Sequence, residues 1–186
     1  MSVAEQIRSA VCRVLVSKLA AKEIECNVYE ERSTALQADE MPLLNVIFAE
    51  TSYTEESSSR SSKAETSIFV EVYTRAESDE DGNSDKYSAN ACVDLANNVR
   101  SVLMRYTERN LDFTDHTITS RVCKKIARSE MKEQFDTNSV CTCIVEMMYT
   151  HEELTDIDKG VLLSNNTTQV LVNQSIIGYK YEYINQ

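Results

Sequence analysis

Cysteine, histidine and carboxylate side chains are the groups in this sequence that could bind a metal ion or act on a substrate. The cysteines form no C-x-x-C pair, which is the spacing typical of zinc ribbons and thioredoxin-like motifs. Cys141 and Cys143 lie two apart in a predicted strand and therefore share a face, and only His116 and His151 could add imidazole ligands. We expect buried thiols that pack as small apolar groups, with no bound metal. The six cysteines are Cys12, Cys26, Cys92, Cys123, Cys141 and Cys143.

The densest group of carboxylates is the second candidate for chemistry. It lies in the acidic stretch 77–86, and because its spacing differs from that of an EF-hand, a solvated loop is expected. The sequence lacks the G-x-S-x-G, H-E-x-x-H, P-loop and Rossmann patterns, and 3 glycines are too few for phosphate-binding loops. We therefore expect a protein that is not an enzyme and has no cofactor. A small metal-dependent enzyme that uses this loop and the two histidines is the alternative. The carboxylates are Asp79, Glu80, Asp81 and Asp85.

Length and charge exclude further classes of function. The chain has 186 residues, of which 42% are apolar and 26% charged, the size of about one domain. Its 30 acidic and 19 basic residues give a net charge of -11, the opposite of a DNA-binding surface. Glu5, Arg8, Arg13 and Lys18 interrupt the N-terminal apolar stretch, so no signal peptide is expected. No run approaches the roughly 20 apolar residues of a membrane span. We expect assembly in the cytoplasm, without membrane contact.

Hydrophobic periodicity predicts two long amphipathic helices, over residues 2–22 and 87–106. Ser84 is the expected cap of the second helix. Pro42 opens a strand that should be central in the sheet, and the polar run 57–62 forms the tip of a β-hairpin with the strand that follows. Residues 30–41 form a polar loop or arm. The other strands are predicted at 24–28, 65–74, 117–131 and 140–149, with a turn at 133–138.

These elements define an α+β fold class: a mixed or antiparallel β-sheet with a long β-hairpin and two main helices packed on one face. Along the last strand, alternate residues 141, 143, 145, 147 and 149 should line the same face. The predicted domain covers residues 1–150. Residues 151–186 form a C-terminal β-rich extension or arm, which covers a sheet edge or lies on a neighbouring subunit.

The order of the elements and four short patterns resemble a known family. The patterns are Pro42 before a hydrophobic strand, the Tyr-Thr-acidic step at Tyr53, Thr54 and Glu55, an I-x-V-x-V strand, and a last strand ending in Met-Tyr. They lie in MPLLNVIFAETSYTEE, AETSIFVEVYTRAE and the helix ANACVDLANNVRSVL. In this order they resemble the tail terminator (tail completion) proteins of tailed bacteriophages, over about residues 3–149.

The resemblance implies a structural virion protein of the tail or neck. In that family copies form a hexameric ring that caps the tail tube, terminates tail polymerisation and provides a head-docking surface. The implied partners are other copies of the chain, the tail tube protein, and the tail sheath and neck or connector proteins. DNA passes through the pore without specific binding, which a negative lining would favour. A neck or head-completion adaptor, or another tail-ring protein, is the nearest alternative.

The same resemblance gives candidate interface residues. The hairpin from Tyr53 to residue 68 is where the family contacts its neighbours or the tube. Exposed ion pairs add only about 0–1 kcal/mol each, so apolar contacts of the hairpin and arm must supply most of the binding energy. The candidates are Tyr53, Glu55, Arg60 and Lys63 in the hairpin, Arg32 in the arm, and Tyr179 and Tyr181 in the C-terminal extension.

Overall fold

The computed structural model describes residues 2–34, 37–54, 61–76, 84–108, 111, 113, 118–129 and 139–154. The chain divides into two compact units, residues 1–154 and residues 155–186. The division therefore falls four residues later than the predicted boundary after residue 150, because the last strand continues to Leu154. The predicted turn at 133–138, the hairpin residues 55–60 and residues 155–186 of the predicted extension lie outside the described residues, whereas residues 151–154 continue β5.

Helix α1 (Val3–Ala20) confirms the first predicted helix, and its N-terminus carries a capping box. The Ser2 hydroxyl accepts the Glu5 amide at 3.2 Å, and the Glu5 carboxylate accepts the Ser2 amide at 2.7 Å. Two amides that the first turn leaves without helical partners are thereby satisfied. The Ser2 hydrogen bonds lower the pKa of the Glu5 carboxyl, since they favour its charged form.

The end of α1 is a Schellman-type turn. The Glu23 amide donates to Ala20 O and the Ile24 amide donates to Leu19 O, each at 3.0 Å. This pattern requires a left-handed residue, and Glu23 adopts φ 59°. The turn redirects the chain into strand β1 (Asn27–Glu30), which starts later than the alternation from Ile24 predicts.

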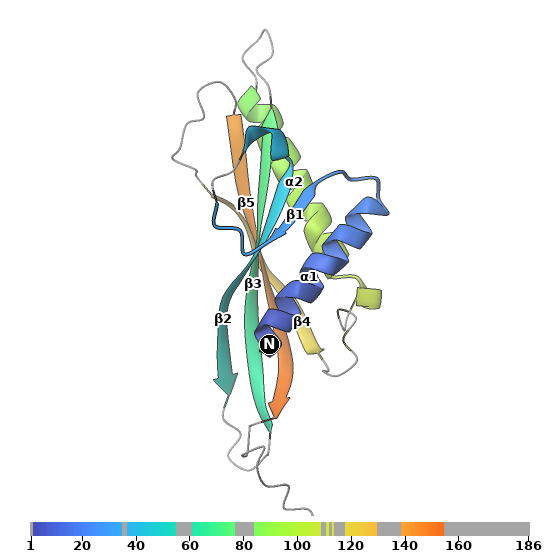
Figure 1. The fold of residues 1–186 in the computed structure, drawn as a ribbon, viewed down its shortest axis with the longest axis vertical. Helices are drawn as coiled ribbons and strands as arrows, with labels where there is room; N and C mark the ends of the chain where they lie inside the picture. Colours follow the sequence, from blue (N-terminus) through green and yellow to red (C-terminus); the bar gives the residue numbers. More distant parts are fainter. Residues whose placement is uncertain are drawn as a thin grey trace, which may run out of the picture. The chain divides into compact units, whose positions relative to one another are not determined.

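The five strands form one sheet in the order β1-β2-β3-β5-β4 (Figure 1). β1 is parallel to β2, and every other neighbouring pair is antiparallel. The prediction that the strand after Pro42 is central holds for its start: β2 lies between β1 and β3 at residues 43–46, beyond which it is paired with β3 alone, and β3 is the middle strand of the sheet. The remaining bounds are β2 (Leu43–Thr54), β3 (Ser61–Ala76), β4 (Ile118–Ser129) and β5 (Ser139–Leu154).

Helix α2 (Ser84–Leu103) packs on β3 and β5, and α1 packs beside it on β1 and β2, so both helices cover the same face (Figure 1). Ser84 is the first helical residue rather than the predicted cap, and the helix ends three residues before Tyr106, which belongs to a short 3₁₀ helix. Another 3₁₀ turn spans Ala38–Glu40 within the predicted arm.

The core lies between the two helices and the sheet. Val46, Val70 and Val145 stand opposite one another across β2, β3 and β5, and all three are fully buried. Burying a side chain of this size contributes about 1.5–3 kcal/mol, so this layer supplies much of the stability. The predicted alternation on the last strand is confirmed, since its inward side chains are all buried: Cys141, Cys143, Val145, Met147 and Tyr149. The fold class is α+β, as the sequence predicts.

Candidate functional surfaces and a buried cysteine cluster

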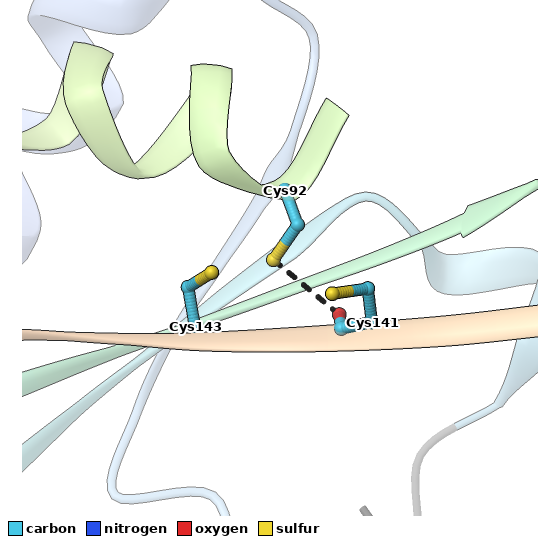
Figure 2. A group of neighbouring side chains, drawn as sticks. All are labelled: Cys92, Cys141 and Cys143. Atoms are coloured by element: carbon cyan, nitrogen blue, oxygen red, sulfur yellow. Dashed lines mark hydrogen bonds between the residues drawn. The ribbon is translucent and has the colours of Figure 1, made fainter. Parts of the chain in front are cut away.

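Three cysteines meet between α2 and β5. Cys92 points from the helix toward the strand residues Cys141 and Cys143 (Figure 2), and the three Sγ atoms lie within 4.8 Å of one another. The Cys92 thiol donates to Val72 O at 3.4 Å and to Cys141 O at 3.5 Å. Sequence reasoning placed Cys141 and Cys143 on one face but missed Cys92. The position of Cys92 on the apolar side of the second predicted helix is the sequence signal that could have identified it.

The cluster has the atoms for a thiophilic ion but an environment that favours thiols. Structural zinc sites use four ligands, and among the described residues only these three sulfur atoms come together. Burial raises the pKa of Cys92 and of Cys143, because a thiolate loses its hydration in the core. The Cys92 and Cys143 thiols therefore remain protonated at neutral pH, and the three buried cysteines pack as small apolar groups.

His151, a candidate ligand and base, is fully buried inside β5. Its Nε2 lies 2.9 Å from the Thr66 hydroxyl, which lies 2.9 Å from the Thr51 hydroxyl. The three side chains form a polar row across β2, β3 and β5. This position is remote from solvent, so it suits a structural role. His116 and the carboxylates Asp79, Glu80 and Asp81 lie outside the described residues, and Asp85 is described only as part of the α2 backbone.

Arg32, a candidate interface residue, is held within its own chain. Its guanidinium lies 4.4 Å from the ring centroid of Tyr29 and forms a 2.7 Å ion pair with Glu40. Its hydrogen bonds and charge lower the pKa of the Glu40 carboxyl. Asn45 accepts the Arg32 amide at 2.9 Å and donates to the Arg32 carbonyl at 3.1 Å. These contacts tie the start of the arm to its end and to β2.

The hairpin candidates lie at the far end of β2 and β3. Tyr53 is 57% exposed, and Lys63, also exposed, pairs with Thr54 across the hairpin. On its other side Lys63 stands opposite Glu152 of β5. The remaining candidates lie outside the described residues: Glu55, Arg60, Tyr179 and Tyr181.

The two edges of the sheet carry opposite charge, a feature that sequence reasoning missed although it is legible in the residue letters. β4, at one edge, contains Arg121, Lys124, Lys125 and Arg128 and no acidic residue. At the other edge, residues 23–31 contain four glutamates and no Lys or Arg. Two of these glutamates, Glu30 and Glu31, are ion-paired with Arg8 of α1 at 2.9 Å each.

A groove of about 740 Å³ lies beside the acidic edge, between the end of α1, β1 and Pro42. Apolar side chains contribute to its lining, among them Val16, which is 53% exposed. Glu23 and Glu25 form part of its rim; both are exposed, and neither has an ion pair with any other residue that the structure describes. The lining also includes Leu19, Ile24 and Val28.

None of the helices within the described ranges is long and apolar enough to cross a membrane. The sequence matches no family model, and a comparison with curated proteins finds no match.

Proposed function

We propose that this chain is a structural protein of a tailed-phage particle, whose copies close into a ring that caps the tail tube, ends its growth and presents a surface for head docking. The protein acts through interface geometry rather than catalysis. One face of the ring is complementary to the tube subunit, and the other cannot recruit a further tube subunit.

The observation that carries this proposal is the projecting end of the sheet, where β5 continues beside the β2–β3 hairpin to the last residue of each strand pair. The far ends of β2, β3 and β5 extend past the N-terminal end of α1 (Figure 1), and β2 changes from buried residues at its start to exposed residues at its end. Tyr53 lies in this exposed part. An exposed tyrosine supplies a large contact area at low entropic cost, which suits it to anchor an interface.

The net charge agrees with the same proposal. Each copy carries -11, so a ring of copies has a strongly negative field. DNA that crosses such a ring is repelled from its wall instead of being bound. This repulsion also opposes assembly, so the contacts between subunits must exceed it.

Tube growth in the presence of the protein tests this function. Purified chain is mixed with polymerising tail tube subunits of the same phage, and tube lengths are measured by electron microscopy. We expect tubes that stop growing and carry a ring at one end. Tyr53→Ala should weaken capping by about thirtyfold or more, because truncating an aromatic hot spot of an interface costs about 2 kcal/mol or more.

Tyr87→Ala is the matched control. Tyr87 is 55% exposed, close to the value for Tyr53, but it lies on α2 and not on the hairpin. Its truncation should leave capping unchanged. Tubes that grow to the same lengths with and without the wild-type chain would contradict the proposed function, and equal effects of the two variants would remove the hairpin from it.

A further inference from the structure

We infer that the two edges of the sheet are the complementary halves of one interface: β4 of one copy docks in the acidic groove beside β1 of the next copy. This inference rests on the proposed ring and identifies the surfaces that would close it. The occupant of the groove is a second copy of this chain.

The β4 edge presents cations around an apolar side chain. Lys124 and Arg128 are exposed and have no ion pair with any residue that the structure describes. Val122, two residues before Lys124, is 40% exposed. Lys125 forms an ion pair with Glu146 at 3.4 Å, and its side chain is still 60% exposed. Val122 stands opposite Met148 on the face of the sheet away from the helices, whereas Arg128 stands opposite Cys143 and shares the helix-covered face. The edge therefore offers cations on both faces and an exposed apolar side chain on one.

The groove at the opposite edge has the matching character. Its apolar lining, with Val16 half exposed, can receive an apolar side chain such as Val122. Its rim carries Glu23 and Glu25, whose charges no described cation neutralises. Lys124 and Arg128 on one edge and Glu23 and Glu25 at the opposite edge carry complementary charges that can meet only between copies.

The location of the two halves dictates the type of assembly. β1 and β4 are the outermost strands of a five-stranded sheet, four strand spacings apart, which is roughly 19 Å. Because the contact joins different surfaces of the two partners, it is heterologous, and each copy keeps a free half for the next one. Such contacts produce a closed ring when the rotation between copies closes, and a filament otherwise.

Edge protection is the simpler explanation of the β4 cations, since lysines on an edge strand hinder unwanted pairing. That explanation covers one edge only. It gives no reason for the groove lined by apolar side chains and two glutamates at the other edge, nor for the exposed Val122 on β4. A complementary contact between copies explains all three observations together.

Charge reversal tests the interface in the full-length chain. One variant carries Lys124→Glu and Arg128→Glu, another carries Glu23→Lys and Glu25→Lys, and a third carries all four substitutions. Oligomer mass is measured by light scattering and sedimentation over a range of concentrations. Each double variant places like charges opposite each other, so its dissociation constant should rise by on the order of 100-fold. The fourfold variant restores opposite charges, and the net charge of -11, and should assemble again.

Mixing the two double variants provides a second test, because the β4 edge of each then faces an oppositely charged groove in the other. We expect rings from the mixture, although neither variant forms rings alone. Lys86→Glu with Arg100→Glu is the control: both residues are exposed on α2, and the change in net charge equals that of the β4 variant. Circular dichroism and thermal unfolding verify that every variant is folded.

The outcomes separate this interface from the proposed function. Restored assembly in the fourfold variant and in the mixture supports the interface. If both double variants form rings as the wild type does, the interface is overturned and the ring function is left intact. A loss of assembly that neither the fourfold variant nor the mixture reverses has the same meaning. If Glu23→Lys with Glu25→Lys prevents assembly and Lys124→Glu with Arg128→Glu does not, the groove binds another occupant, such as the C-terminal extension or a tube subunit. This result also overturns the interface. Wild-type chain that stays monomeric with and without tail tubes contradicts the ring itself.

Discussion

Lys18 on α1 and Glu108 in the 3₁₀ helix after α2 form an ion pair of 3.0 Å that joins the two helical segments. Only 4% of the Glu108 side chain is exposed, whereas Lys18 is 38% exposed. Lys18→Ala leaves this carboxylate with the Thr107 hydroxyl, at 3.1 Å, as its hydrogen-bond donor. We expect the free energy of unfolding, measured with urea, to fall by about 1–3 kcal/mol, because a buried charge loses its counterion.

Two variants control this measurement. Adding Glu108→Gln to Lys18→Ala should recover part of the loss, because a neutral amide is cheaper to bury than an unpaired carboxylate. Lys124→Ala removes an exposed lysine without a described ion pair and should change stability by less than about 0.5 kcal/mol. If Lys18→Ala and Lys124→Ala changed the free energy of unfolding by the same small amount, the ion pair would contribute nothing to helix docking.

Glu23 is held in a conformation that suits glycine better. It follows α1 with φ 59°, where a Cβ atom costs roughly 1–2 kcal/mol. Glu23→Gly should raise the thermal midpoint, with a net gain of about 0.5–1 kcal/mol once the greater freedom of glycine in the unfolded chain is subtracted. Glu25→Gly, two residues on and without a positive φ, should give no gain. Destabilisation by Glu23→Gly would show that the glutamate makes a compensating contact.

Local patterns predicted most of this fold because they report on nearby residues. The spacing from Ile7 to Leu19 and the alternation from Cys141 to Tyr149 each follow from one buried face, and both are confirmed. The prediction that the strand after Pro42 is central was incomplete for a different reason. The near-continuous apolar start of β2 is typical of a strand covered on both faces, and α1 covers one face while the arm contacts Asn45 through Arg32, without making β2 the middle strand.

The cysteine cluster and the ion pair of Lys18 with Glu108 were harder to predict than the fold, because the residues of each come from elements that are distant in the sequence. Cys92 meets Cys141 and Cys143 only through the packing of α2 on β5, and no spacing in the sequence encodes that contact. Lys18 and Glu108 are likewise far apart in the chain. Arg32 was correctly found in the arm, but whether an arginine faces a partner or its own chain depends on Tyr29 and Glu40, which reach it through the fold.

The buried thiols predict a loss of stability at high pH. Burial raises the pKa of Cys92 above its value in the unfolded chain, so above pH of about 8.5 the unfolded thiol releases its proton while the folded thiol retains it. The stabilisation is complete below that pH and is lost as pH rises toward the folded pKa. Between pH 9 and 11 the Cys92 thiol should lower the free energy of unfolding by about 1.4 kcal/mol per pH unit.

Cys92→Ala isolates this effect. The variant loses some core packing at every pH, but its stability should fall less steeply with pH than that of the wild type, by one thiol's contribution. Urea unfolding of both proteins at several pH values between 7 and 11 measures the two slopes. Parallel slopes would mean that the Cys92 proton is released as easily in the folded protein as in the unfolded chain.

The salt dependence of self-association reports how the edge contact and the net charge compete. The repulsion between copies of charge -11 acts over long distances and is screened first, since the Debye length falls from about 30 Å at 0.01 M to about 10 Å at 0.1 M. Ion pairs between β4 and the acidic rim act at a few ångströms and weaken mainly near 1 M, where that length is about 3 Å. Sedimentation should therefore show association that strengthens up to about 0.15 M salt and weakens toward 1 M. The variant with Lys124→Glu and Arg128→Glu lacks the attraction and gains repulsion, so its weaker association should rise with salt throughout. A wild-type curve that also rises throughout would show that charge attraction between the edges plays no part in holding the copies together.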